Sequence, residues 1–210
     1  MSAELLTKDE FAMQELSYNS DKVLDGTLTG IVTYIKIDEG NHVLSRYEED
    51  SWMFPPSMSH AGQYISHRTL NFAKIKKIEQ QRMAKRIILQ FMKEGKALGT
   101  LNMCLKNLSL YFQWVNNQEI SELNAFTARE YVKYVNTLIS NYGKYKGEPL
   151  SKSTKDKRFE ALEKLYRHCN HFDFVKEHPW IESSAKEQAG LVGQVLADYQ
   201  NKPHNRAYPR

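Results

Sequence analysis

The sequence has little cysteine and no long apolar stretch. Only two of its 210 residues are cysteines, Cys104 and Cys169, too few for the dense disulfide framework of small secreted domains. Both fall on apolar faces of predicted helices, where a free thiol acts as a small hydrophobic group. No run of about 18 apolar residues offers a membrane-spanning helix, and the N-terminus, MSAELLTKDEFAMQEL, has neither the basic start nor the apolar core of a signal peptide. We therefore expect a soluble, cytoplasmic protein with no membrane partner.

Signatures of common catalytic and metal sites are also missing. The sequence contains no Gly-rich phosphate loop, no Ser nucleophile elbow and no HExxH. His168, Cys169, His171 and His178 are close in sequence, but they lack the paired spacings of structural zinc sites. We expect this chain to hold no catalytic residues, no metal, no cofactor and no small-molecule substrate.

Charge is unevenly distributed along the chain. Residues 1–66 carry four Lys and Arg against eleven Asp and Glu, a net charge of −7, whereas residues 67–210 carry 25 against 14, a net charge of +11. A basic excess of this size in a folded region is typical of proteins that bind polyanions, although Lys-rich helix faces can also be merely solvated. The basic part is therefore where a nucleic-acid interface is to be sought.

The first third has the pattern of a small α+β module. Apolar residues between positions 5 and 16 are compatible with a short helix or a loose arm. β-branched residues then alternate from Thr27 to Ile37, a turn-like DEGN comes next, and HVLSRY resumes an extended pattern, which predicts a β-hairpin with its turn at Asp38 to Asn41. The Pro- and Gly-punctuated stretch after it predicts an ordered loop anchored by Trp52 and Phe54.

The remainder is predicted to be mainly α-helical. Periodicity indicates helices from Thr69 to about Gly95, from an N-cap at Thr100 onward, from a Thr127/Glu130 capping box to Gly143, and from about residue 151 to His171. Lys85 is expected to point away from the interior. The inward positions we expect are Leu70, Phe72, Ile75, Ile78, Met83, Ile87, Phe91 and Met92; Leu101, Cys104, Leu105, Leu108, Tyr111, Phe112 and Val115; Tyr131, Val135, Leu138 and Ile139; and Phe159, Leu162, Leu165, Tyr166 and Cys169.

The start of the last predicted helix carries an unusual charge. A helix N-terminus is the positive end of the macrodipole, so each cation placed there loses about 0.3–1 kcal/mol at low salt. Here that turn is rich in cations, and the hydroxyls of Ser151, Ser153 and Thr154 can cap it. Cations around free backbone N–H groups form a phosphate-sized site, although Asp156 and Glu160 could instead neutralise a solvated turn. The residues that we predict to bind DNA are Lys152, Ser153, Thr154, Lys155, Lys157 and Arg158.

A longer pattern resembles a known family. LGTLNMCLKNLSLYFQWV, ELNAFTAREYVKYVNTLIS, LSKSTKDKRFEALEKLYRHC and EHPW are similar to the core-binding domain of tyrosine recombinases, the phage-type integrases. That family's domain has a Thr-led helix ending in a yFxxW-like segment, a t-x-x-d/e-v-x-x-y helix and an S-x-x-T helix. The matching positions are Thr100, Phe112, Trp114, Thr127, Glu130, Tyr131, Ser151, Thr154, Leu162, Leu165 and His178–Pro179–Trp180.

The resemblance implies a small helical bundle that clamps recombination-site duplex DNA. It makes SKSTKDKR the leading contact, with Thr100, Asn102 and Lys106 as secondary ones. It also implies DNA integration in a longer parent protein, because the family's Tyr nucleophile and its Arg, Lys, His and Arg constellation lie in a separate catalytic domain. This chain has no His-x-x-Arg, so the parent is an enzyme only if a catalytic domain lies after Arg210.

Four segments are expected on this interpretation. They are an acidic N-terminal module with the hairpin at 1–66, a basic connecting helix at 67–95, the helical core-binding domain at 96–182, and a linker or tail toward a catalytic domain at 183–210. The expected partners are double-stranded DNA in the nucleoid and further copies of the chain on that DNA. The alternative is a stand-alone helical module that binds an acidic partner protein. A helix-turn-helix transcription factor fits less well, because a long loop separates the relevant helices.

Overall fold

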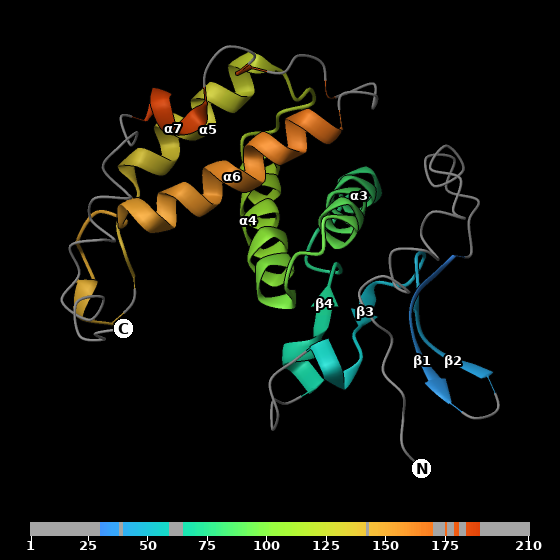
Figure 1. Ribbon diagram of the computed structural model, residues 1–210. Helices are drawn as coiled ribbons and strands as arrows, with labels where there is room; N and C mark the ends of the chain where they lie inside the picture. The colour runs from blue at the N-terminus through green and yellow to red at the C-terminus, as the bar shows by residue number, and fades with distance from the viewer. Residues whose placement is uncertain are drawn as a thin grey trace. The chain divides into compact units, whose positions relative to one another are not determined.

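The fold is mainly helical with two small antiparallel sheets. The computed structural model describes residues 30–37, 40–58, 65–141, 143–169, 175, 179–180 and 184–189, and among these are five α-helices and two two-stranded sheets (Figure 1). The predicted class, a helical domain with a small β module, is confirmed. The chain divides into two compact units, residues 1–109 and 110–210. The four-segment division stays a prediction, and the segment at residues 5–16 lies outside the described residues.

The predicted hairpin is present in the first unit. Strand β1 (Ile31–Ile37) pairs antiparallel with β2 (Gly40–Arg46), and Ile37 lies opposite Gly40 at the closed end. Asp38 and Glu39, in the predicted turn, lie outside the described residues. The register shifts twice along β1, between Ile31 and Tyr34. The hairpin is thus a twisted ribbon, and the alternation of β-branched residues located it correctly.

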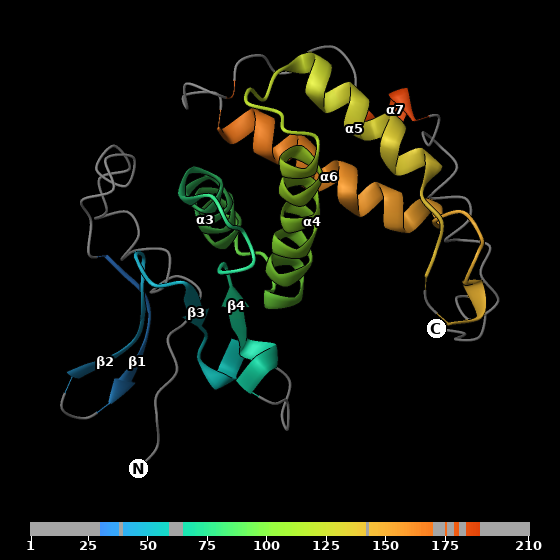
Figure 2. The same ribbon diagram turned by 180° about the vertical axis from the view of Figure 1, so that it is seen from behind.

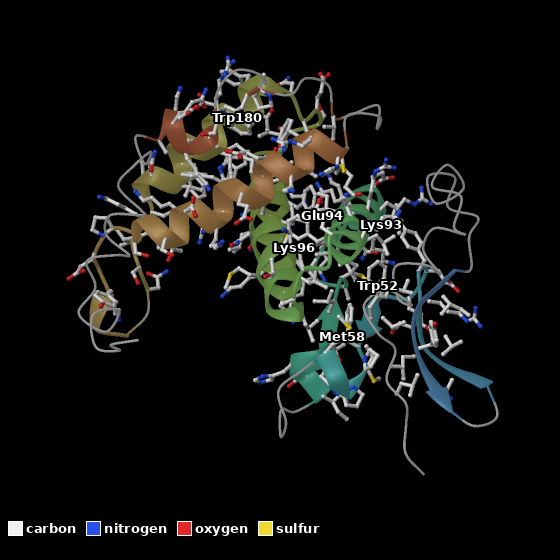
Figure 3. All side chains as sticks on the ribbon, in the orientation of Figure 1. Trp52, Met58, Lys93, Glu94, Lys96 and Trp180 are labelled. Carbon is white, nitrogen blue, oxygen red and sulfur yellow. The ribbon has the colours of Figure 1, made fainter. Side chains whose placement is uncertain are left out.

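A second strand pair begins in the segment predicted to be a loop. Strand β3 (Ser51–Met53) pairs antiparallel with β4 (Thr69–Asn71), after the short 3₁₀ turns η1 (Pro56–Met58) and η2 (Ile65–Arg68). Trp52, labelled in Figure 3, lies opposite Leu70 and is fully buried, as is Phe54. The hydroxyls of Thr33 and Ser45 donate to the Met53 carbonyl and so connect the hairpin to β3. Trp52 and Phe54 are therefore anchors, as predicted.

The helix predicted from Thr69 begins later. Helix α3 runs from Ile78 to Lys93, after β4 and a turn. Leu70, Phe72 and Ile75 are buried as predicted, but they reach the interior from β4 and the turn rather than from a helix. Ile78, the first helical residue, is 52% exposed instead of inward, because the true helix start places it on the outer face. The basic segment 67–95 is helical only in its second part.

The prediction for Lys85 is wrong. Lys85 is only 4% exposed, and its Nζ donates a hydrogen bond to the Tyr47 carbonyl at 2.8 Å. The same nitrogen lies 5.4 Å from the Tyr47 ring centroid, 6.0 Å from that of Trp52 and 5.5 Å from that of Phe72. We call these three rings the Lys85 cage. Because a buried ammonium group needs a hydrogen-bond acceptor and favourable electrostatics, the cage turns an expected surface lysine into a core residue.

Helix α4 spans Leu98–Asn117 and confirms the predicted apolar stripe. All seven inward residues are buried, including Cys104, which is a free thiol like the buried Cys169. Thr100, however, is not the N-cap. The backbone N–H groups of Thr100 and Leu101 both donate to the Ala97 carbonyl, so the helix has begun two residues before Thr100. Leu98 is buried, and its burial stabilises this earlier start.

Helix α5 spans Ala125–Thr137, and its predicted capping box is wrong. Asn124 is the N-cap, and its side chain accepts a hydrogen bond from the Thr127 N–H at 3.0 Å. Thr127 is buried and uses its hydroxyl to donate to the Glu122 carbonyl at 3.1 Å. At the other end the helix stops at Thr137, so Ile139 is 55% exposed instead of inward. Tyr131 and Val135 are buried as predicted.

A clamped loop connects α5 to the next helix. Ile139 pairs with Pro149 in a β-bridge, and backbone hydrogen bonds join Ser140 N–H to the Glu148 carbonyl at 2.7 Å and Leu150 N–H to the Leu138 carbonyl at 3.0 Å. The 3₁₀ turn η3 (Gly143–Tyr145) lies within the loop. These bonds fix the end of α5 next to the segment that enters α6.

Helix α6 spans Lys152–His168, and α7 spans Ala185–Gln188. The five residues predicted to face inward are all buried; four lie on α6 and the fifth is its C-cap, Cys169. Both Figures 1 and 2 show α7 beside α5 and α6, and the Ala185 N–H donates to Glu163 Oε1 at 2.7 Å. Trp180 is buried with its ring edge-on to Tyr166 at 6.2 Å. None of the described helices has the length and apolar character needed to cross a membrane.

Candidate nucleic-acid interface

The first turn of α6 carries the predicted cations. Ser151 is the N-cap, and its hydroxyl accepts a hydrogen bond from the Thr154 N–H at 3.2 Å. No acidic residue occupies the first turn, although acidic residues are the ones that the helix dipole favours there. Ser153 and Thr154 are exposed. We call the cations Lys152, Lys155, Lys157 and Arg158 around this start the basic turn.

Lys155 and Lys157 of the basic turn have weak partners on the protein. Lys157 Nζ pairs with Glu160 at 2.8 Å, three residues along the same exposed face. Lys155 Nζ donates to the Asn136 carbonyl at 3.4 Å, near the end of α5. An exposed ion pair of this kind stabilises by only about 0.2–1 kcal/mol. A phosphate could therefore replace Glu160 as the partner of Lys157 at little cost.

One acidic residue close to the basic turn has a partner on another helix. Asp156 follows the first turn of α6 and forms an ion pair at 2.8 Å with Lys186 of α7. Burial alone would lower the pKa of Lys186. The hydrogen bond to Asp156 and the negative charge of Asp156 are among the causes that instead raise this pKa above its ordinary value. Glu160 faces Lys157 of the basic turn, and Asp156 joins α6 to α7 through its pair with Lys186.

Arg158 lies close to a buried phenol. Burial raises the pKa of Tyr131 to about 12, and the nearby positive charge of Arg158 lowers it in part. Arg158 Nε and the Tyr131 hydroxyl are both buried. Arg158 is thus the cation of the basic turn that lies beside the buried Tyr131 phenol.

The secondary candidates lie on α4 and are not one cluster. Thr100 and Lys106 are exposed, and Asn102 is half-buried. Helical spacing places Asn102 and Lys106 on one face and Thr100 on another. The Asn102 amide group already donates to the carbonyls of His67 and Leu98, each at 3.4 Å. These residues belong to the unit of residues 1–109, whereas the basic turn belongs to residues 110–210.

The sequence-based site missed a group of aromatic side chains in the same unit as the basic turn. The Trp114 ring stacks on Tyr111 (6.2 Å, 22°) and on Tyr134 (5.9 Å, 26°). Tyr131 packs its edge against Tyr111 at 4.8 Å. We call Tyr111, Trp114, Tyr131 and Tyr134 the aromatic ladder. Its outermost ring, Tyr134, is 40% exposed, and the only signal for this in the sequence was the spacing of aromatic residues on two different helices.

The described residues contain no group of three or more His, Cys, Asp or Glu that could hold a metal ion. His171 and His178 lie outside them, and Cys169 is buried in the core. Comparison with protein-family models, with curated proteins and with solved structures found no match for this chain. The functional interpretation therefore depends on the geometry and charge of the site itself.

Proposed function

We propose that the chain binds double-stranded DNA through the basic turn of α6, as the DNA-binding portion of a site-specific recombinase of the tyrosine recombinase type. The observation that carries this is the gathering of four cations around a capped helix start that has no acidic residue in its first turn. Helix N-termini bind phosphate through backbone N–H groups and the macrodipole, and cations add to the attraction. The recombinase assignment comes from the sequence pattern alone.

The internal contacts of Lys155 and Lys157 are weaker than those that an external polyanion offers. Lys157 has an exposed ion pair with Glu160 and Lys155 a long hydrogen bond to the Asn136 carbonyl, and each of these is weak. A DNA backbone offers a phosphate to each cation and releases condensed counterions. That release is the main source of affinity in non-specific DNA binding.

Charge reversal at two cations of the basic turn tests this function. Lys152→Glu with Lys157→Glu should weaken duplex binding by at least tenfold and make the log–log dependence of affinity on salt shallower by about 2, since each neutralised phosphate contributes about 0.9. Arg158 and Lys155 are left unchanged because their packing contacts could make reversal unfold the unit. Fluorescence anisotropy of a labelled duplex at two salt concentrations measures both quantities.

The matched control reverses the same number of charges elsewhere. Lys93 and Lys96, labelled in Figure 3 with Glu94, lie at the end of α3 and just after it, and both are exposed. Lys93→Glu with Lys96→Glu changes the net charge equally and removes the pair of Lys96 with Glu94 at 3.8 Å. Equal weakening by both double variants would show a diffuse charge effect and contradict the assignment to α6. If the wild type does not bind duplex DNA but binds an acidic protein, the alternative holds, in which the chain is a helical module for protein interaction.

A further inference from the structure

The aromatic ladder ends in a ring that the protein leaves open. Tyr111 is buried, Trp114 is half-buried and Tyr134 is exposed, so the stacked series Tyr111–Trp114–Tyr134 leads from the interior to solvent. A stacked tyrosine is rigid because its neighbours fix the ring. Rigid, exposed aromatic rings are suited to receive another flat π-system.

The ladder adjoins the basic turn. Arg158 of the turn lies beside the Tyr131 phenol of the ladder, whose pKa burial raises and the charge of Arg158 lowers in part. Lys155 reaches the carbonyl of Asn136, two residues after Tyr134 on α5. All these residues belong to one compact unit. A strand whose phosphates lie on the basic turn would therefore pass close to the outer ring.

Cations that track a phosphate backbone beside an aromatic platform are the combination by which proteins bind single-stranded nucleic acid. A base inside an intact duplex is already stacked on both faces and cannot use such a platform. We infer that Tyr134 stacks on a base that has left the DNA duplex, so that the ligand is duplex DNA with a locally unpaired segment. This rests on the proposed function, because the basic turn must hold the backbone.

The charges near Tyr134 favour a nucleotide base over other groups that can stack on its ring. The neighbouring charges of the turn repel a cationic side chain and attract a phosphate ester. Lys133, next to Tyr134 on α5, is 73% exposed and pairs with Glu130 at 2.6 Å, so a further cation lies at the rim. A nucleotide offers both the anion and the flat ring that this surface lacks.

The test compares two DNA probes that differ only in pairing. One is a fully paired duplex, and the other has the same length and a bubble of three mismatched pairs; both contain 2-aminopurine at the same position. The wild type should bind the bubble about tenfold more tightly or better, the effect expected for one stacked base, and should quench the 2-aminopurine. Tyr134→Ala should lose both the preference and the quenching, whereas Tyr134→Phe should keep them.

Controls separate this inference from the proposed function and from misfolding. Tyr145→Ala removes an exposed tyrosine that is not part of the ladder and should leave the preference intact; thermal melting by circular dichroism checks that each variant is folded. Duplex binding without a bubble preference, or a preference that survives Tyr134→Ala, overturns the inference and leaves the proposed function standing. If the wild type binds neither probe, the inference and the proposed function are both wrong. If Tyr134→Ala dissociates a dimer of the free protein in sedimentation, a second copy of the chain occupies the ring and the inference is wrong.

Discussion

Replacement of Lys85 should reveal how much the Lys85 cage stabilises the first unit. Lys85→Met keeps a long apolar side chain but removes the charge-assisted hydrogen bond to the Tyr47 carbonyl, worth about 1.5–3 kcal/mol. It also removes the cation–π attraction to rings at 5.4–6.0 Å, worth about 0.5–2 kcal/mol. Relief of the buried charge offsets part of this loss. We expect the free energy of unfolding to fall by about 1–2 kcal/mol.

Lys85→Ala should cost more than Lys85→Met. Compared with Met, it removes three further groups of the buried side chain, a methylene, a sulfur and a methyl, at about 0.8 kcal/mol each, and so adds about 2 kcal/mol to the loss. Urea unfolding monitored by near-ultraviolet circular dichroism and tryptophan emission measures the three proteins. Lys76→Met is the control, because Lys76 is exposed in the turn before α3 and its loss changes the net charge equally. A Lys85→Met protein as stable as the Lys76→Met protein would refute the role assigned to the cage.

The pH dependence of stability provides a second readout of the same residue. Desolvation lowers the pKa of Lys85 below its ordinary 10.5, although Asp50, Glu48 and Glu49 oppose the shift and Arg82 adds to it. The unfolded chain therefore keeps this proton to a higher pH than the folded chain does. The free energy of unfolding should rise as the pH increases from the folded pKa toward 10.5. In Lys85→Met that increment should vanish, as urea titrations at stepped pH would show.

Three further predictions concern the second unit. Ser151→Ala should lower stability by about 0.5–2 kcal/mol, and Ser151→Gly by only a few tenths, in thermal melts, because the hydroxyl caps α6. Tyr166→Phe removes the hydroxyl that donates to the Asn124 carbonyl at 3.1 Å and should cost about 1–3 kcal/mol in urea titrations, since it removes the donor from a part-buried acceptor. Burial raises the pKa of Glu163 above its ordinary 4.5, so stability should fall as the pH rises from 4.5 through the folded pKa, and melts of Glu163→Gln should not show that fall.

Local periodicity was sufficient for the long helices and insufficient for the segment before α3. The stripe on α4 needed only the spacing of apolar residues along one helix. Leu70 also fits a helical spacing, but its partner is Trp52 on β3, eighteen positions earlier, and no single window of sequence contains that pairing. The helix starts failed for a related reason. Asn124 and Thr127 are both capable caps, and the choice was made by the burial of Thr127 and its bond to the Glu122 carbonyl.

The candidate site could also be predicted from the sequence only in part. The cations of the basic turn could be predicted because their type and spacing are visible in the sequence. The contacts of each cation could not be predicted, because they depend on other helices. Lys186 of α7 pairs with Asp156, and the phenol of Tyr131 on α5 lies beside Arg158. The ladder depends on the packing of α4 against α5, so Tyr134 looked like any other helical tyrosine.

The clamp between α5 and α6 bears on the thermodynamics of ligand capture. Bonds such as those from Ser140 to Glu148 and from Leu150 to Leu138 already restrict the backbone that leads into the basic turn. An anion that arrives there need not order a coil, so little conformational entropy is lost on association. Calorimetry should accordingly show a small heat-capacity change, unlike the large one of a basic arm that folds around its target.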